Sequence, residues 1–282
     1  MSITLYTATG CVRCRMVRQF LKERDRTYCH HDALGEGKEA FRSFYQANRQ
    51  KIYRGPDGVE FPVYCEGEII RQGLPAVLAY LVAGTSLDGF FTHGRKHGQW
   101  IDGIEVSRGN PAHGEDFLEV LTYLKNQEFK IQVDTNGVNA DLLAFVIQQK
   151  LADCIIMEVK GPLGLYGLLL QQPVEPGEIE KSIILVSKYS EHSFVTTIAP
   201  VVRQPGNPPE ISYITPEEVA DAAKLIRTAT GDSRQPYRLR LFDPRNANDE
   251  RLRTCEALAP GVLFKYRTQA RKYQFKTEIL KD

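Results

Sequence analysis

The chain has 282 residues, of which 42% are hydrophobic and 25% are charged, and its formal net charge is +1. This length allows two domains with a buried core each, and the balanced charge gives no overall attraction to nucleic acid or to anionic membranes. No apolar run is long enough to span a membrane, and the first residues lack the basic start and apolar core of a signal peptide. We therefore expect a cytoplasmic protein with no membrane partner.

The chain carries six cysteines, too few and too scattered for the disulfide framework of a secreted domain. Only Cys11 and Cys14 lie close together, between a predicted strand at 3–7 and a segment of helical period. This layout puts Cys11 at a helix N-terminus, where backbone N–H groups favour the thiolate, and Arg13 adds positive charge. We expect Cys11 to be the attacking thiolate and Cys14 the resolving thiol.

The residues that follow predict a strand at 27–30, an amphipathic helix at 36–48, a hairpin at 59–70 and a helix at 76–82. The run Cys29-His30-His31 at the end of the predicted strand raises the alternative of a zinc site. Neighbouring strand residues point to opposite faces of a sheet, so these side chains could not easily bind the same ion. We expect no metal here.

This order of elements, with Cys11-Val12-Arg13-Cys14 after the first strand and Phe61-Pro62 in the hairpin, resembles the glutaredoxin branch of the thioredoxin fold. The resemblance implies a domain at 1–84 that performs thiol–disulfide exchange, with a cis-proline facing the cysteines. The residues that it implies for substrate binding are Arg13, Phe61, Pro62 and Gly73.

The sequence departs from that family in three places, one of which is the absence of a lysine just ahead of Cys11. Val12-Arg13 replaces the usual Pro-Tyr, and Leu74-Pro75 stands where glutathione-binding members often carry an acidic residue. Because redox poise depends on the residues near the thiols, glutathione is only one candidate reductant. An iron–sulfur cluster shared by Cys11 and Cys14 of two chains, as in some glutaredoxins, is another alternative.

The segment 85–99 is rich in glycine and charge, and we expect a solvated linker there. From Trp100 onward, strands are predicted at 101–107, 129–133, 154–159, 193–199 and 237–242, with helices at 115–126, 139–149, 178–188 and 215–228. Thr215 and Glu218 form a capping-box pattern at the start of the last helix. Five strands with crossover helices predict an α/β domain at 100–282, a parallel sheet or partial (β/α) barrel with functional residues at the strand ends.

The strand ends carry three motifs in order: Arg108-Gly109-Asn110-Pro111, Asp134-Thr135-Asn136-Gly137 and Glu158-Val159-Lys160. They resemble the Gly-Gly-Glu-Pro, Asp-Thr-Asn-Gly and Asp-x-Lys motifs of radical SAM activating enzymes of the glycyl-radical type. The resemblance implies a radical-enzyme partner and a residual ligand or cation site at Gly109, Asn110, Asp134, Thr135, Asn136, Glu158 and Lys160. In the structural alternative the glycines serve strand-to-helix turns and the charges pair with one another.

Activating enzymes hold a [4Fe–4S] cluster, which binds S-adenosylmethionine (SAM), on three cysteines spaced C-x3-C-x2-C. The sequence has no such triple, and Asn110 replaces the glutamate of Gly-Gly-Glu-Pro. We therefore do not expect radical SAM catalysis by this chain alone.

The tail 264–276 interleaves basic and aromatic residues, a pattern that can bind single-stranded nucleic acid. The balanced charge of the whole chain favours an amphipathic segment that packs on the second domain instead.

Together these observations predict a thiol–disulfide oxidoreductase that uses Cys11 and Cys14 for electron transfer to a protein disulfide, with the partial barrel as the docking module. The alternative is a binding or scaffold protein, a remnant of a radical SAM activating enzyme that performs no catalysis. No resident cofactor is certain; glutathione and an iron–sulfur cluster are the candidates.

Overall fold

The fold comes from a computed structural model that describes residues 3–55, 58–204, 206, 210–247 and 249–280. By its internal packing the chain divides into two units, Met1–Gln132 and Val133–Asp282. Among the described residues, no helix combines the length and the apolar composition needed to cross a bilayer.

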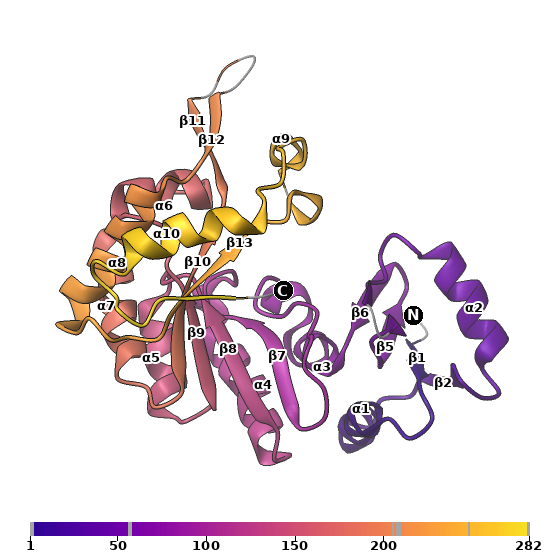
Figure 1. Cartoon of the computed structure of the whole chain (residues 1–282). Helices are drawn as coiled ribbons and strands as arrows, with labels where there is room; N and C mark the ends of the chain where they lie inside the picture. Colours follow the sequence, from indigo (N-terminus) through magenta and orange to yellow (C-terminus); the bar gives the residue numbers. More distant parts are fainter. Residues whose placement is uncertain (1–2, 56–57, 205, 207–209, 248, 281–282) are drawn as a thin grey trace. The chain divides into compact units, whose positions relative to one another are not determined.

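The first unit contains a four-stranded sheet with the strand order β2-β1-β5-β6 (Figure 1). Strand β1 runs parallel to β2 and antiparallel to β5, and β5 is antiparallel to β6. The strands are β1 Ile3–Thr7, β2 Cys29–Asp32, β5 Val63–Glu66 and β6 Ile69–Gln72, with a separate hairpin of β3 Arg54–Gly55 and β4 Gly58–Val59. The helices are α1 Val12–Glu23, α2 Lys38–Ala47, α3 Leu74–Ala83 and α4 Gly114–Asn126, with 3-10 turns η1 Gly84–Leu87 and η2 Pro111–His113.

Helix α1 forms because its apolar residues recur at helical spacing. Cys14, Val17, Phe20 and Leu21 share the buried face, while the intervening residues are largely charged and exposed. At its N-terminus the Cys11 sulfur accepts a hydrogen bond from the backbone N–H of Cys14 at 3.1 Å. Cys11 is therefore the N-cap of α1, so it lies at the helix N-terminus as the sequence predicts.

The segment 85–99 differs from the expected solvated linker. Leu87 is 2% exposed, and Phe90 is fully buried and stacks on Phe117 of α4 with ring centroids 4.4 Å apart. Phe91 forms a β-bridge with Ile104. This segment is therefore part of the first unit, which runs to Gln132. The domain boundaries expected at 84 and 100 stay a prediction.

The larger sheet has six parallel strands in the order β14-β13-β10-β9-β8-β7, one more than the sequence predicts. They are β7 Trp100–Glu105, β8 Lys130–Thr135, β9 Cys154–Glu158, β10 His192–Ile198, β13 Tyr237–Leu241 and the added β14 Glu278–Ile279. This mixed α/β architecture is consistent with a partial (β/α) barrel.

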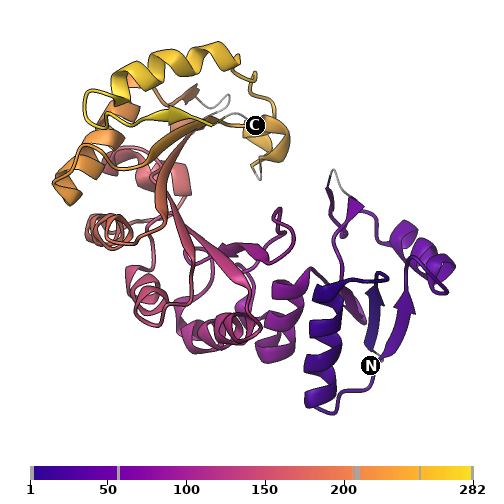
Figure 2. The same cartoon turned by 60° about the horizontal axis from the view of Figure 1, so that its bottom comes forward.

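In the second unit, helices α5, α7 and α8 follow one another along one face of the curved sheet (Figure 2). The helices are α5 Ala140–Gln148, α6 Leu163–Leu170, α7 Pro176–Ser187, α8 Pro216–Thr230, α9 Glu250–Arg253 and α10 Leu263–Ala270, with 3-10 turns η3 Pro244–Asn246 and η4 Pro260–Val262. An antiparallel hairpin is formed by β11 Pro200–Gln204 and β12 Glu210–Tyr213. The capping box at Thr215 and Glu218 is present at the start of α8, as predicted.

The basic and aromatic tail packs against this unit. Helix α10 lies against α8, and the Tyr266 hydroxyl donates to the backbone carbonyl of Ile214 at 2.8 Å. Gln274 is fully buried and accepts a hydrogen bond from the Gln235 backbone N–H at 3.0 Å. These contacts support the structural interpretation of the tail.

Candidate functional site

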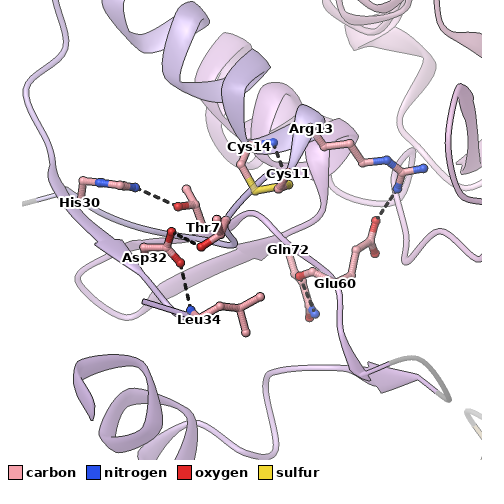
Figure 3. The surroundings of a disulfide bond; sticks show 10 residues. Thr7, Cys11, Arg13, Cys14, His30, Asp32, Leu34, Glu60 and Gln72 are labelled. Carbon is pink, nitrogen blue, oxygen red and sulfur yellow. Dashed lines mark hydrogen bonds and ion pairs between the residues drawn. A yellow bond between two sulfur atoms is a disulfide. The ribbon is translucent and has the colours of Figure 1, made fainter. Parts of the chain in front are cut away.

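Cys11 and Cys14 form a disulfide at the N-terminus of α1 (Figure 3). Their Cα atoms are 5.3 Å apart, within the usual range for a disulfide. Gly10, with φ of +75°, turns the chain from β1 into the helix. Cys14 is 2% exposed, whereas Cys11 is partly exposed. Cys11 is therefore the sulfur that a partner can reach.

A polar pocket of about 440 Å³ lies on one side of the disulfide. In it, the Thr9 hydroxyl donates to the Asp32 carboxylate at 2.7 Å, and Thr7 Oγ1 is 2.8 Å from Nε2 of His30. The Thr9 hydrogen bond lowers the pKa of Asp32, and burial lowers the pKa of His30. Near neutral pH the pocket thus holds an ionised carboxylate and a neutral imidazole.

A second pocket, of about 580 Å³, also reaches Cys11. Its lining includes Arg13 and Phe61, two of the residues expected to bind substrate. Pro62 does not line this pocket: it is buried, follows a cis peptide bond, and its carbonyl accepts the Gly73 N–H at 2.9 Å. The structure thus brings Cys11, Arg13 and Phe61 together around one pocket, whereas Pro62 and Gly73 are not part of its lining.

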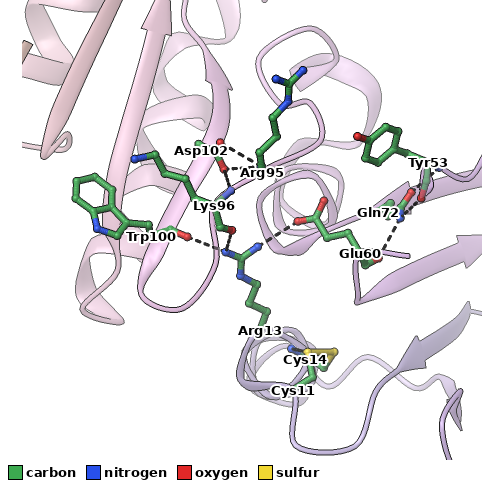
Figure 4. A network of polar contacts seen from close by, with 10 residues as sticks. All are labelled: Cys11, Arg13, Cys14, Tyr53, Glu60, Gln72, Arg95, Lys96, Trp100 and Asp102. Carbon is green, nitrogen blue, oxygen red and sulfur yellow. Dashed lines mark hydrogen bonds and ion pairs between the residues drawn. A yellow bond between two sulfur atoms is a disulfide. The ribbon is translucent and has the colours of Figure 1, made fainter. Parts of the chain in front are cut away.

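The Arg13 side chain is used for internal contacts (Figure 4). Its Nη1 lies 3.2 Å from Oε1 of Glu60, and its Nη2 donates to the backbone carbonyls of Lys96 and Trp100, both at 2.7 Å. The Arg13 and Glu60 side chains are only 14% and 16% exposed. Arg13 therefore shapes the wall of the pocket, and its guanidinium already has three partners.

The sequence analysis missed Glu60. Burial raises the pKa of its carboxyl, and the nearby Arg13 guanidinium opposes this shift. Among the described residues its Oε2 is buried without a hydrogen-bond partner. A Cβ at Gly73, where φ is +82°, would lie 2.6 Å from Oε1 of Glu60. The positive φ favours glycine at position 73, and its lack of a side chain leaves space for the Glu60 carboxylate.

The cysteine and histidines of β2 point in alternate directions. Cys29 Sγ lies 3.4 Å from Nε2 of His31, while His30 contacts Thr7. Across the described residues, no three His, Cys, Asp or Glu side chains lie close enough together to hold a metal ion. An iron–sulfur cluster needs several thiolates at one place, so the described residues do not fit a cluster held by this chain alone.

The motif Asp134-Thr135-Asn136-Gly137 builds the turn after β8. Thr135 Oγ1 accepts the Gly137 N–H at 3.0 Å, and Asn136 Oδ1 accepts the Val138 N–H at 3.1 Å. Gly137 has φ of +97°, and a Cβ there would lie 2.7 Å from Cε of Met157. Thr135, Asn136 and Gly137 therefore contribute to the geometry and the close packing of this turn.

Gly109 and Asn110 have comparable roles in the first unit. A Cβ at Gly109 would lie 2.1 Å from the buried ring of Phe90. The Asn110 side chain caps η2 by accepting the Ala112 N–H at 3.0 Å. Packing and capping thus suffice to explain both residues.

Four polar side chains form a cluster at the carboxyl ends of β9, β10 and β13. Oε2 of Glu158 is 2.6 Å from Nζ of Lys160, and its Oε1 is 2.5 Å from the Thr197 hydroxyl and 3.5 Å from Arg240. Arg240 Nε also donates to Thr197 Oγ1 at 2.8 Å. Sequence reasoning identified Glu158 and Lys160 but missed Thr197 and Arg240, which come from later strands.

These contacts hold Glu158 ionised. Burial alone would raise its pKa, but Lys160 and Arg240 outweigh burial and lower the pKa of Glu158 to about 2. Since the folded-state pKa lies below the ordinary 4.5, the ionised carboxylate stabilises the fold above pH 4.5, and this contribution is lost as the pH falls toward 2.

We expect Glu158→Gln to destabilise the protein by roughly 2–3 kcal/mol at pH 7, because Lys160 and Arg240 lose their counter-charge. The deficit should shrink between pH 4.5 and pH 2, where the wild-type carboxylate itself becomes protonated. Thermal unfolding across this range measures the effect. Glu278→Gln is the control, since Glu278 is 71% exposed and its oxygen lies 4.0 Å from Arg238. A deficit independent of pH would contradict this account.

Comparison with known proteins finds a relative among the curated proteins. Over 180 residues the chain is 24% identical to a protein of Methanocaldococcus jannaschii described as a candidate glycyl-radical enzyme activating enzyme, covering 62% of this chain and 68% of that protein. A solved domain of the pyruvate-formate lyase-activating enzyme from Bacteroides vulgatus is 14% identical, with a TM-score of 0.43, over 63% of this chain and 98% of that domain. No protein-family model matches the chain.

The sequence similarity supports the resemblance to radical SAM activating enzymes. It does not bear on the resemblance to glutaredoxins, which stays a prediction. Of the two functions predicted from sequence, the similarity favours the activating-enzyme remnant over the thiol–disulfide oxidoreductase.

Proposed function

We propose that this chain is a binding protein derived from glycyl-radical activating enzymes, which engages a radical-enzyme partner without cleaving SAM. The similarity to the M. jannaschii protein supports the origin. The lack of a C-x3-C-x2-C triple in the sequence supports the loss of the cluster-dependent reaction.

The observation that carries this proposal is the cluster of Glu158, Lys160, Thr197 and Arg240. At the strand ends that the resemblance assigns to ligand binding, these side chains bond to one another. The Glu158 carboxylate already has Lys160, Thr197 and Arg240 as partners, so a ligand at this place would have to displace them. The cluster therefore favours a structural role at this edge of the sheet.

The test is anaerobic reconstitution of the full chain with iron and sulfide, followed by SAM and dithionite. We expect no formation of 5′-deoxyadenosine, and we expect calorimetric titration with a purified glycyl-radical enzyme to show saturable binding. Formation of 5′-deoxyadenosine would overturn the loss of catalysis. Absence of binding to glycyl-radical enzymes would overturn the choice of partner. Iron retained on Cys11 and Cys14 would instead favour the shared cluster.

Thiol–disulfide exchange is the second candidate, favoured by the Cys11–Cys14 disulfide and by the two pockets that reach Cys11. The sheet order β2-β1-β5-β6 also supports a glutaredoxin-like domain at 1–84. In the reduced protein, the Cys11 thiolate would attack a partner disulfide, form a mixed disulfide and release one partner thiolate. The Cys14 thiolate would then attack the Cys11 sulfur and release the second, so that the partner gains two electrons. A dithiol reductant would restore the pair.

A further inference from the structure

One face of α1 carries an unbalanced positive charge. A groove of about 640 Å³ along α1 and the loop that follows it is lined by Arg15, Arg18, Lys22 and Arg26, with Asp25 as its one acid. We call these four cations the basic face. All four residues are exposed.

The positive charges of the basic face are not neutralised by ion pairs within the described residues. Among the described residues, none of the four forms an ion pair, whereas their neighbour Arg24 pairs with Glu119 at 3.5 Å and lies over the Phe20 ring. Arg15, Arg18 and Lys22 follow each other at spacings of three and four, which places them on one side of the helix. Uncompensated like charges at such spacing are mildly destabilising, so their arrangement is not explained by stability.

The basic face leads directly to the disulfide. Arg15 and Arg18 also line the polar pocket that contains Cys11 and Cys14. Charge in that pocket is otherwise limited to His30, whose pKa burial lowers, and to Asp32, which is bonded to Thr9. A ligand on the basic face would therefore extend to the partly exposed Cys11.

We propose that the basic face binds an acidic polypeptide segment of the partner and directs it to Cys11. From Arg15 to Lys22 the helix rises roughly 10 Å, the length of about three residues of extended chain. A row of this length fits successive carboxylates better than one small anion. Among the described residues, Tyr28 is the only aromatic residue that lines the groove, so these residues do not provide the stacking platforms of a single-strand nucleic-acid site.

This inference names the charge of the partner and rests on the proposal that the chain binds one. A charged surface of this kind mainly increases the association rate and the specificity of binding. Dissolved salt weakens its effect by screening the charges. Binding should therefore weaken steeply between low and high ionic strength.

The binding test uses the full chain with both Cys11 and Cys14 changed to serine, so that no exchange chemistry contributes. The probes are fluorescein-labelled decapeptides with alternating glutamate or alternating lysine, measured by anisotropy at low and high salt. The charge-reversal variant is Arg15→Glu, Arg18→Glu and Lys22→Glu. The matched control is Lys38→Glu, Arg42→Glu and Arg49→Glu, exposed positions on and just after α2 with the same change in charge.

We expect the glutamate peptide to bind at least about tenfold more tightly than the lysine peptide, and the charge-reversal variant alone to lose this preference. Equal binding of the two peptides, or equal loss in both variants, would overturn the proposal. Tighter binding of oligo-dT on the same residues would point to nucleic acid and also overturn it. Displacement of the peptide by millimolar glutathione would point to a small anionic thiol, with the same consequence.

A kinetic experiment distinguishes failure of this inference from failure of the proposed exchange function. Mixed-disulfide formation is timed for Cys14→Ser protein with peptide disulfides flanked by glutamate or by lysine. Exchange at equal rates with both peptides would overturn the proposed role of the basic face in binding, while leaving the proposed thiol chemistry intact. Charge-dependent anisotropy without any exchange would overturn the thiol chemistry while supporting the basic face.

Discussion

If the chain performs the thiol–disulfide exchange proposed as its second candidate function, changing Cys11 to serine is expected to reduce exchange to the uncatalysed rate, while Cys14→Ser should accumulate a one-to-one mixed disulfide with its substrate. Cys11 is the partly exposed sulfur beside both pockets, and Cys14 is 2% exposed beneath it. Without Cys14, nothing on this helix can attack the mixed disulfide, so the intermediate persists. Reduction of insulin by the pre-reduced protein gives the rate, and intact mass spectrometry gives the trapped adduct.

Cys65→Ser is the matched control for these variants. Cys65 is a partly exposed thiol in the same unit, its pKa is raised by burial, and its sulfur lies 3.5 Å from the Gly67 carbonyl. It should retain the full rate. Insulin reduction that survives in Cys11→Ser would exclude thiol–disulfide exchange at this pair, and an adduct identified from Cys14→Ser would name the partner.

Replacing Arg13 by alanine is expected to destabilise the protein by about 3–5 kcal/mol. The change would leave the mostly buried Glu60 carboxylate without its cation and would remove one donor from the carbonyls of both Lys96 and Trp100. Denaturant unfolding measures the loss. Arg15→Ala is the control, because Arg15 is exposed on the same helix and its loss should change stability by less than about 0.5 kcal/mol.

The pH dependence identifies the cause of this loss. Burial already raises the pKa of Glu60, and without Arg13 it should rise further. An acid with a raised folded-state pKa costs stability as the pH climbs above its unfolded value, so the deficit of Arg13→Ala should be smaller at pH 4.5 than at pH 7.5. Glu60→Gln in the same chain should recover part of the deficit at pH 7.5. If the loss of stability in Arg13→Ala changed neither with pH nor on addition of Glu60→Gln, it would come from the carbonyls of Lys96 and Trp100 alone.

Local patterns were sufficient to predict most of the elements. The apolar spacing of Val17, Phe20 and Leu21 predicts α1, and the capping box at Thr215 predicts the start of α8, because each depends on residues within one or two turns. The strands β7 to β10 and β13 appear within a few residues of their predicted bounds. For the site, the C-x-x-C spacing located the disulfide for the same reason.

The features that the sequence did not reveal depend on contacts between distant residues. Strand β14 has two residues, too few to show alternation, and exists because it pairs with β13. The glycines of 85–99 suggested a solvated segment, whereas Leu87 and Phe90 are buried and Phe90 stacks on Phe117 of α4, which comes later in the chain. Glu60 has no local motif, since its partner Arg13 is 47 residues away.

If the Cys11–Cys14 pair serves the proposed exchange function, the Arg13 contacts restrict how sequence change can adjust its redox potential. In C-x-x-C proteins the two intervening residues are the positions at which sequence change adjusts the potential. Here Arg13, one of these two residues, binds Glu60 and the backbone carbonyls of Lys96 and Trp100. A substitution of Arg13 would therefore be eliminated by selection because it lowers stability, before any useful change in redox potential could be selected. Val12, which is 46% exposed, is left as the position free to drift. Mutational tolerance across the motif should therefore be strongly asymmetric.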